Sequence, residues 1–388
     1  MKNAINYLYN FNIDNLRMIN NNYYFVYQNN QYILQEIKGT EFSYNAIYEL
    51  NKRLSNNNMF YRIFLNKNNE IVSVINNKKY ILLIDNSVED REFDIFDILN
   101  THIDLDNNTK KDKLLNELNR FDWVKLWTRK IDYFESYMIH NSAKYLKLNK
   151  YINYFVGLGE NAISYAMDTL DEIKPGFSDR LVISHKRIDI KNGLKDLYNP
   201  LNLIVDHPSR DIAEYFKMLL IAQPQKINDI IDDLSMINLT NYGVRLLMSR
   251  MLFPSFFFDS FENFIDEKVD FYDIVKLVEK MNSYEEKLYK IYAIIKNQYS
   301  LPEINWLKKV DYSSTFTTPN TSGTSFINNA SMPSFNVISS MLQWLQAPVN
   351  LTYAIPSSNF INSTFPPSLI KNGLILSIIS IIFFSVSI

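Results

Sequence analysis

The stretch between residues 181 and 216 constrains the fold more than any other part of the chain. Two short apolar runs, Leu181–Ser184 and Leu201–Val205, place branched residues between turn signals, and they predict two buried strands. Pro208 and Ser209 follow the second run and predict a capped helix start. That helix is expected to bury one apolar face, made of Ile212, Tyr215, Phe216, Leu219 and Leu220.

Polar side chains follow both predicted strands. His185 and Arg187 come at the end of the first strand, Asn192 lies in the connecting loop, and Asp206 ends the second strand. This layout is typical of a kinase catalytic segment. Such a segment carries a carboxylate two residues after the His, which orients or deprotonates the attacking hydroxyl, and an Asn five residues later. The Asn and the Asp of the next strand hold Mg²⁺ on the phosphates, so Asn192 and Asp206 are the candidate cofactor and metal ligands.

The catalytic carboxylate position is occupied by Arg187. A guanidinium is always protonated and cannot accept a proton, and a positioned general base contributes roughly 10²–10⁴ in rate. We therefore expect that a chain with Arg187 at this position does not transfer phosphate efficiently. Asp189 could replace the missing base, but it lies on the wrong side of Arg187.

The role of Asp206 stays open at this point because Asp211 follows it so closely. In kinases the metal-binding Asp lies well upstream of the Asp that opens the following helix. Either the loop between the two has shrunk, or Asp206 belongs to the later structural motif and the metal carboxylate is gone. Arg210 and Asp211 are expected to make a buried contact that ties the helix to the catalytic loop.

Three blocks of sequence carry a resemblance to a known family. NLIVDHPSRDIAEYF, WVKLWTRKIDYFE (Trp123–Glu135) and YFVGLGENAISYAMDT (Tyr154–Thr169) resemble the YutH-type spore-coat proteins, which are relatives of the CotS coat proteins in the aminoglycoside/choline-kinase-like superfamily. The similarity covers about residue 1 to Lys309. It implies an α+β, protein-kinase-like two-lobed fold, with a β-rich N-lobe at residues 1–86 and a helical C-lobe at residues 87–311.

The N-lobe lacks the features of an ATP site. Gly39 is the only glycine before Gly157, so a glycine-rich phosphate loop is absent. The resemblance implies a strand Lys paired with a helix Glu, and the expected Lys position is Gln35. Lys38 is nearby and could pair with a glutamate, although a solvated strand end is the preferred interpretation; the candidate partners are Glu41 and Glu49.

Hydrophobic spacing predicts the remaining elements. Tyr23–Tyr27 and Gln31–Ile37 predict a hairpin. Apolar residues from Leu114 to Met138 recur every three or four positions and predict one long helix. Leu158–Leu170 predicts the next helix, with Glu160 in its opening turn. A phenylalanine-rich patch at Pro254–Phe264 is interpreted as lobe core, with an exposed docking patch as the alternative.

Composition excludes several classes of function. The chain has no Cys, so disulfides and thiolate chemistry are excluded. A net charge of −2 argues against nucleic-acid binding. The four histidines are dispersed without metal-ligand spacing, which disfavours a zinc site. The first residues lack the continuous apolar segment of a secretory signal.

Residues 312–388 form a low-complexity tail that ends in an apolar segment. Leu374–Ile388 would span roughly 22 Å as a helix, less than the roughly 30 Å hydrocarbon core of a membrane. Counting back to Ser368 reaches about 30 Å, so membrane contact through this segment is conceivable. A disordered tail, or one created by a reading-frame change, ranks above a true membrane anchor.

The resemblance implies a function in sporulation. The expected protein is a pseudokinase of the spore coat, a catalytically degenerate module acting in coat assembly with other spore-coat proteins as partners. It would be made in the mother-cell cytoplasm and then laid onto the coat, with no cofactor beyond residual ATP or Mg²⁺. The alternatives are an active small-molecule or protein phosphotransferase with a non-standard site, and a protein tethered to a membrane by its C-terminal segment.

Overall fold

A computed structural model describes residues 1–37, 44–85, 88–104, 116–141, 145 and 148–307. All of them belong to one compact unit that extends from Met1 to Ile338. The predictions for Lys38, Glu41 and the tail at 312–388 lie outside the described residues. The small lobe is the described part of residues 1–85, and the large lobe is that of residues 88–307.

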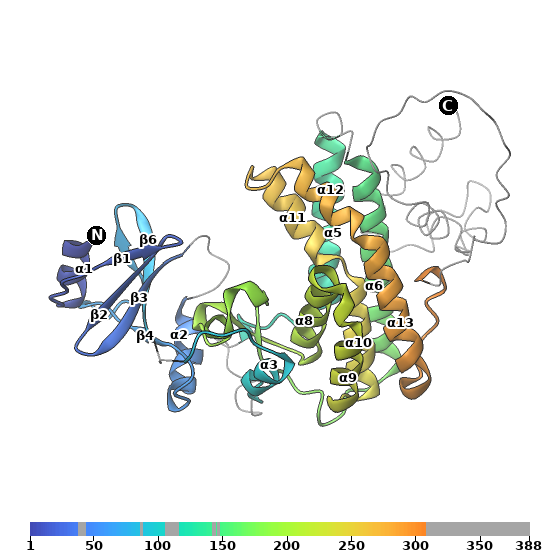
Figure 1. The fold of residues 1–388 in the computed structure, drawn as a ribbon, viewed down its shortest axis with the longest axis horizontal. Helices are drawn as coiled ribbons and strands as arrows, with labels where there is room; N and C mark the ends of the chain where they lie inside the picture. The colour runs from blue at the N-terminus through green and yellow to red at the C-terminus, as the bar shows by residue number, and fades with distance from the viewer. Residues whose placement is uncertain (38–43, 86–87, 105–115, 142–144, 146–147, 308–388) are drawn as a thin grey trace, which may run out of the picture. The chain divides into compact units, whose positions relative to one another are not determined.

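The small lobe contains an antiparallel sheet with the strand order β1-β2-β3-β6-β4. Strand β4 pairs with the last residues of β6, and β5 pairs with its first residues, Lys78–Tyr80. Figure 1 shows this sheet in blue at the N-terminal end of the chain. The strands are β1 (Arg17–Ile19), β2 (Asn22–Tyr27), β3 (Asn30–Ile37), β4 (Arg62–Phe64), β5 (Ser73–Ile75) and β6 (Lys78–Ile84).

Asparagine makes the tight turns of this glycine-poor sheet. Gln28 and Asn29 join β2 to β3 with φ values of 47° and 63°, so the predicted hairpin is confirmed. Asn20 and Asn21 join β1 to β2 in the same left-handed region, with φ values of 49° and 64°. Two successive residues with positive φ give the turn whose twist matches paired strands, and Asn tolerates that conformation better than other side chains.

Helix α1 (Lys2–Tyr9) and strand β1 were not expected from the sequence. The core cluster that α1 shares with the sheet includes Ile5, Tyr9, Phe25, Tyr32 and Leu34, all at most 5% exposed. Helix α2 (Tyr44–Arg53), also in this lobe, is connected to β4 through Asn51. The Asn51 side chain donates to the Tyr61 carbonyl at 2.6 Å and accepts from the Ile63 amide at 2.9 Å.

The large lobe is helical apart from one two-stranded ribbon, β7 and β8, so the α+β class is confirmed. Helices α5, α6 and α10 pack side by side, and α8 packs on α10 (Figure 1). The helices are α3 (Ile95–Thr101), α5 (Trp123–Asn141), α6 (Asn149–Glu172), α7 (Leu194–Leu197), α8 (Ser209–Ala222), α9 (Ile227–Met236), α10 (Asn241–Leu252), α11 (Ser255–Ile265), α12 (Phe271–Glu279) and α13 (Met281–Tyr299).

Three expectations about helix boundaries were wrong. The single long helix predicted from Leu114 to Met138 is interrupted over the described residues 117–122, because Asn119 bridges to Val205 and the Arg120 amide donates to the Val205 carbonyl. Helix α5 therefore begins at Trp123, and Leu114 itself lies outside the described residues. Helix α6 begins at Asn149, so Glu160 lies in its middle instead of its opening turn. The Ser209 side chain does not cap α8, since its hydroxyl donates to the Gly243 carbonyl at 2.6 Å.

The phenylalanine patch of α11 is core. Phe257, Phe258 and Phe261 are fully buried. The Phe257 ring stacks on Phe155 of α6 at 3.7 Å between centroids, and Phe258 stacks on Phe134 of α5 at 4.8 Å. The core interpretation is confirmed, and the docking alternative was wrong for these three side chains.

Candidate functional site

The two strands predicted to frame the site form one buried ribbon. β7 (Val182–His185) pairs antiparallel with β8 (Leu203–Asp206), in the register Val182↔Asp206 and His185↔Leu203. All eight residues are buried. Because the pairing is antiparallel, His185 and Asp206 lie at opposite ends of the ribbon, roughly 10 Å apart along it.

Two residues at the start of α8 fasten the end of β7. Asp211 accepts hydrogen bonds from the His185 amide at 3.2 Å and from its Nδ1 at 2.7 Å. Arg210 donates through Nε to the His185 carbonyl at 3.0 Å and through Nη2 to the Lys186 carbonyl at 3.2 Å. The expected contact between Arg210–Asp211 and the catalytic loop is therefore confirmed.

His185 is a buried structural group whose two ring nitrogens are both engaged. Its Nε2 lies 3.0 Å from the Leu197 carbonyl, which can only accept, so this nitrogen donates. Burial alone lowers the pKa of His185, but the Asp211 carboxylate more than offsets it, and the net pKa is raised. Burial raises the pKa of Asp211, and the two histidines His185 and His102 reverse this and lower it strongly.

Asp206 is fully buried, and its carboxylate is engaged by three donors. Oδ1 accepts from the Trp123 indole at 2.9 Å and from the His207 amide at 2.7 Å. Oδ2 accepts from Nη1 of Arg210 at 2.9 Å. Of the two alternatives for this residue, the geometry favours a structural carboxylate, since a metal ion here would have to displace the Trp123 and Arg210 side chains.

Arg187 is exposed and held by the helical lobe. Its side chain is 65% exposed, and Nη2 lies 2.9 Å from Oδ2 of Asp259 on α11. Nη1 donates to the Lys186 carbonyl at 3.0 Å. Lys130 of α5 also reaches Asp259, at 3.6 Å. The position where a general base would stand is thus occupied by a paired cation.

The asparagine that contacts Arg187 is Asn202, which the sequence reasoning missed. Asn202 Nδ2 donates to the Arg187 carbonyl at 3.0 Å, and its Oδ1 accepts from the Arg187 amide at 3.3 Å. Asn192 is exposed and donates to Asp196 at 3.2 Å. Spacing from His185 predicted Asn192 for this region, but Asn192 ends a 3₁₀ turn, and α7 and a second 3₁₀ turn follow it before β8 begins. The usable signal was the position of Asn202 directly before the apolar run of β8.

Asp189, the possible substitute base, is engaged by its own loop. Its side chain accepts from the Lys191 amide at 3.0 Å and begins the 3₁₀ turn Ile190–Asn192. Asp196 has a raised pKa because it is buried, although Asn192 donates to its carboxylate. Both carboxylates thus stabilise the segment between β7 and β8.

Gln35, at the position expected for the nucleotide lysine, lies on β3 and accepts from Asn199 Nδ2 at 3.0 Å. A cavity of about 650 Å³ lies elsewhere on the small lobe, between the residues before β1 and the strands β2 and β3. Its charged lining residues are Asp14, Arg17 and Asp85. Because two carboxylates and one guanidinium line this cavity, its charge repels a polyphosphate.

A buried charge cluster on α8 and α10 was not foreseen. Glu214 accepts from Arg250 Nε at 2.9 Å and from Lys217 Nζ at 3.2 Å, and Lys217 also donates to the Phe253 carbonyl at 3.0 Å. Burial lowers the pKa of Lys217 to about 8 and that of Arg250 to about 10. Burial raises the pKa of Glu214, but the two cations lower it to about 2.

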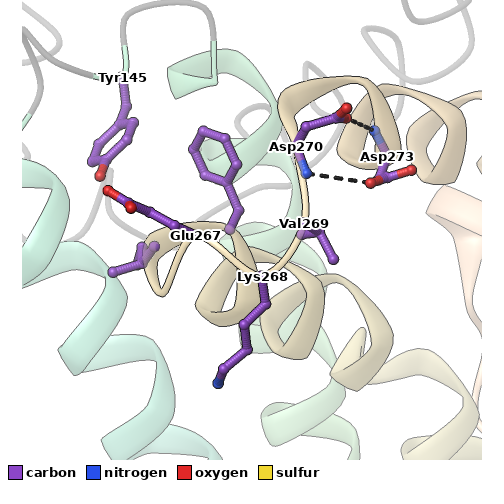
Figure 2. A pocket seen from close by; sticks show the side chains of 8 residues that line it. Tyr145, Glu267, Lys268, Val269, Asp270 and Asp273 are labelled. Atoms are coloured by element: carbon purple, nitrogen blue, oxygen red, sulfur yellow. Dashed lines mark hydrogen bonds between the residues drawn. The ribbon is translucent and has the colours of Figure 1, made fainter.

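A second cavity, of about 600 Å³, lies between the end of α11, the start of α12 and Tyr145 (Figure 2). Its two aspartates face each other across the start of α12. The Asp270 carboxylate accepts from the Asp273 amide at 3.0 Å, and the Asp273 carboxylate accepts from the Asp270 amide at 3.2 Å. This reciprocal capping box explains both acids as helix-start residues.

The described ranges contain neither a cluster of metal ligands nor a helix suited to crossing a membrane. Within them, no three His, Asp or Glu side chains gather in an arrangement suited to a metal ion. Among the described helices, none combines the length and the apolar character that crossing a bilayer requires. Leu374–Ile388 lies outside these ranges.

Comparisons with known proteins agree with the sequence blocks and the lobe layout. The family model described as "Spore coat putative kinase YutH" matches residues 2–297. The Endospore coat-associated protein YutH of Bacillus subtilis (strain 168) is 26% identical over 213 residues. That match covers 48% of this chain and 61% of the relative, so the chain spans about three fifths of the relative's length.

One solved structure shows the fold. An aminoglycoside phosphotransferase from Alicyclobacillus acidocaldarius superposes with a TM-score of 0.50 at 9% identity, covering 77% of this chain and 96% of that one. The spectinomycin phosphotransferase APH(9)-Ia gives a TM-score of 0.42 at 11% identity, covering 75% and 96%. The predicted kinase-like fold is confirmed, and the chain belongs to the YutH family of spore coat putative kinases.

Proposed function

We propose that this protein is a spore-coat component that uses a kinase-like fold for assembly and contacts, and that it does not transfer phosphate. Its partners are other spore-coat proteins, and it is made in the mother-cell cytoplasm before it joins the coat. The family match and the coat-associated relative in Bacillus subtilis support the coat location.

The observation that carries the proposal is the environment of Arg187. A proton acceptor would have to work from this position, two residues after His185, and a guanidinium cannot do so. The backbone on both sides of Arg187 is bonded to Asn202, and the side chain pairs with Asp259. Because these contacts fix the local chain, a carboxylate from elsewhere would not easily take this place.

Two further contacts support the loss of catalysis. The Asp206 carboxylate is buried and is satisfied by Trp123, His207 and Arg210. A metal ion would therefore have to compete with three charge-assisted hydrogen bonds to this carboxylate. Gln35 bonds to Asn199 and carries no charge for a phosphate.

The alternative phosphotransferase would depend on Asp189 as the base. Asp189 accepts a hydrogen bond from its own loop, and the charged lining of the small-lobe cavity disfavours a polyphosphate. The membrane-tethered alternative depends on Leu374–Ile388, and no observation among the described residues favours it.

The coat role is tested in sporulating cells. A fluorescent fusion of the full chain should form a ring around the forespore, and a fusion carrying Arg187→Ala and Asp189→Asn should form the same ring, because the role needs the fold and not the chemistry. Diffuse fluorescence of the unchanged protein throughout sporulation would contradict the coat role. A ring lost only in the double variant would contradict the non-catalytic role.

A further inference from the structure

The ten residues Gly193–Asn202, called the interlobe latch below, run from the loop after β7 to the start of β8 and contact both lobes. The latch contains α7 and the 3₁₀ turn Pro200–Asn202. It is packed as tightly as core, since Leu194, Leu197 and Tyr198 are each at most 4% exposed. A surface loop of this length would normally leave such side chains in water.

The middle of the latch binds the small lobe. Asn199 donates from its side-chain amide to Gln35 on β3 at 3.0 Å. The Tyr198 carbonyl accepts from the Tyr61 amide at 3.1 Å, next to β4. The Tyr198 ring also meets the buried Phe60 ring edge-to-face at 5.3 Å. These contacts join residues more than 130 positions apart in the chain, and they do so through backbone, amide and aromatic groups together.

The start of the latch binds the segment that connects the lobes. Lys195 Nζ lies 2.9 Å from Oδ2 of Asp85, whose side chain is only 5% exposed. The Leu194 amide donates to the Arg91 carbonyl at 2.7 Å. Gly193 permits this approach, because its φ is 74° and a Cβ there would clash with Oδ1 of Asp90.

The large lobe holds the latch from the opposite side. His185 Nε2 donates to the Leu197 carbonyl at 3.0 Å, and Lys186 Nζ donates to the Leu201 carbonyl at 2.8 Å. His185 is itself fastened by Asp211. The chain of contacts therefore continues from α8 through His185 and the latch to β3 and β4.

We propose that the interlobe latch locks the two lobes into a single arrangement, with Gly193 as the residue that allows it to close. Lobe opening loads and empties many two-lobed enzymes, and here it would have to break the latch contacts to Gln35, Tyr61 and Asp85. The proposal goes beyond the coat role, and it stands whether or not the protein turns out to transfer phosphate.

The test measures the distance between the lobes directly. The chain has no cysteine, so Lys79→Cys on β6 and Lys174→Cys after α6 give two unique spin-label sites, both exposed in the full chain. Pulsed dipolar spectroscopy should give one narrow distance distribution in this background. Adding Gln35→Ala and Lys195→Ala, which removes the two polar side-chain contacts to Asn199 and Asp85 and leaves the Tyr198–Phe60 ring contact, should broaden the distribution toward longer distances.

The matched control is Lys191→Ala, an exposed neighbour of the latch, which should keep the narrow distribution. Gly193→Ala is the independent second variant, and it should broaden the distribution as well, without removing any side-chain bond. Circular dichroism confirms that each variant is folded before its distribution is compared. A broad distribution in the unchanged background, or a narrow one in every folded latch variant, would overturn the proposal.

Discussion

The Asp211 carboxylate lies 2.7 Å from Nδ1 of His185, and both side chains are completely buried. This pair connects the end of β7 to the first turn of α8, and Arg210 completes the connection through the His185 carbonyl. In a kinase segment the same region would position reacting groups. Here its contacts stabilise the ribbon and, through Leu197, the interlobe latch.

Removing one partner of the His185–Asp211 pair should strongly destabilise the folded protein. Asp211→Ala leaves His185 buried without its counter-charge and should lower the free energy of unfolding by about 3–5 kcal/mol. Chemical denaturation of the full chain measures this. The exposed Asp232→Ala on α9 serves as the control and should stay within about 0.5 kcal/mol of the unchanged protein. Equal effects of the two substitutions would contradict the structural role of Asp211.

The pair also predicts a pH dependence. The Asp211 carboxylate raises the pKa of His185 in the folded state above its ordinary value of 6.5, although burial alone would lower it. Its stabilisation is therefore fully present below about pH 6.5 and is lost as the pH rises through the folded pKa. His185→Gln should remove this alkaline loss, so the difference in unfolding free energy between the two proteins should shrink above neutral pH. A constant difference between pH 5 and pH 9 would contradict the charged pair.

Lys217 predicts a change of the opposite sign. Burial lowers the pKa of Lys217 to about 8 in the folded protein, from an ordinary value of 10.5, so the folded state binds the proton less tightly than the unfolded chain. Stability from this group should rise with pH between about 8 and 10.5. Lys217→Met keeps an unbranched side chain without the charge and should lack this rise. The measurement is the unfolding free energy of both proteins over that range, and parallel curves would contradict the buried ammonium.

The Trp123 indole should contribute more to the free energy of unfolding than the burial of its ring alone, because it also donates a hydrogen bond to Asp206. Trp123→Phe removes the donor to the buried Asp206 carboxylate and should cost about 1–3 kcal/mol beyond the packing loss. Trp127→Phe is the matched control, since Trp127 lies on the same helix, is similarly buried and stacks on Phe253 at 4.4 Å. Equal losses from the two substitutions would show that packing alone is responsible.

One stabilising substitution is expected at the end of α11. Glu267 has a φ of 58°, and its amide donates to the Phe264 carbonyl just after the helix ends. Glycine adopts this conformation without strain, so Glu267→Gly should raise the unfolding free energy by about 0.5–1 kcal/mol. Glu267→Ala keeps a Cβ and should give no such gain. A loss of stability with glycine would mean that the Glu267 side chain contributes more than its backbone strain costs.

Local pattern was enough to predict the strands of the ribbon and most helices. Leu203, Ile204 and Val205 form a branched run between turn residues, and such a run has few alternatives to a buried strand. The buried face of α8 likewise follows from helical spacing. Helix α1 was missed because its apolar residues are separated by asparagines, which are common in loops, and its burial depends on strands that follow later.

The site could be predicted only in part, because its decisive contacts are distant in sequence. The Asp206 carboxylate, for example, accepts a hydrogen bond from the Trp123 indole, which lies 83 positions earlier in the chain. Asn202 was missed because the chain between β7 and β8 contains a short helix of its own, α7, so residue spacing from His185 does not indicate which asparagine contacts Arg187. The cluster of Glu214, Lys217 and Arg250 looks like a solvated helix face in sequence, and only the packing of α8 on α10 buries it.

The most direct test of the non-catalytic account is a phosphotransfer measurement on the purified full chain with Mg²⁺ and γ-labelled ATP, followed both as self-labelling and as phosphate release. The account predicts that the unchanged protein and its Asp189→Asn variant give the same rate as buffer alone. Turnover clearly above that rate in the unchanged protein, abolished in a folded Asp189→Asn variant, would contradict it.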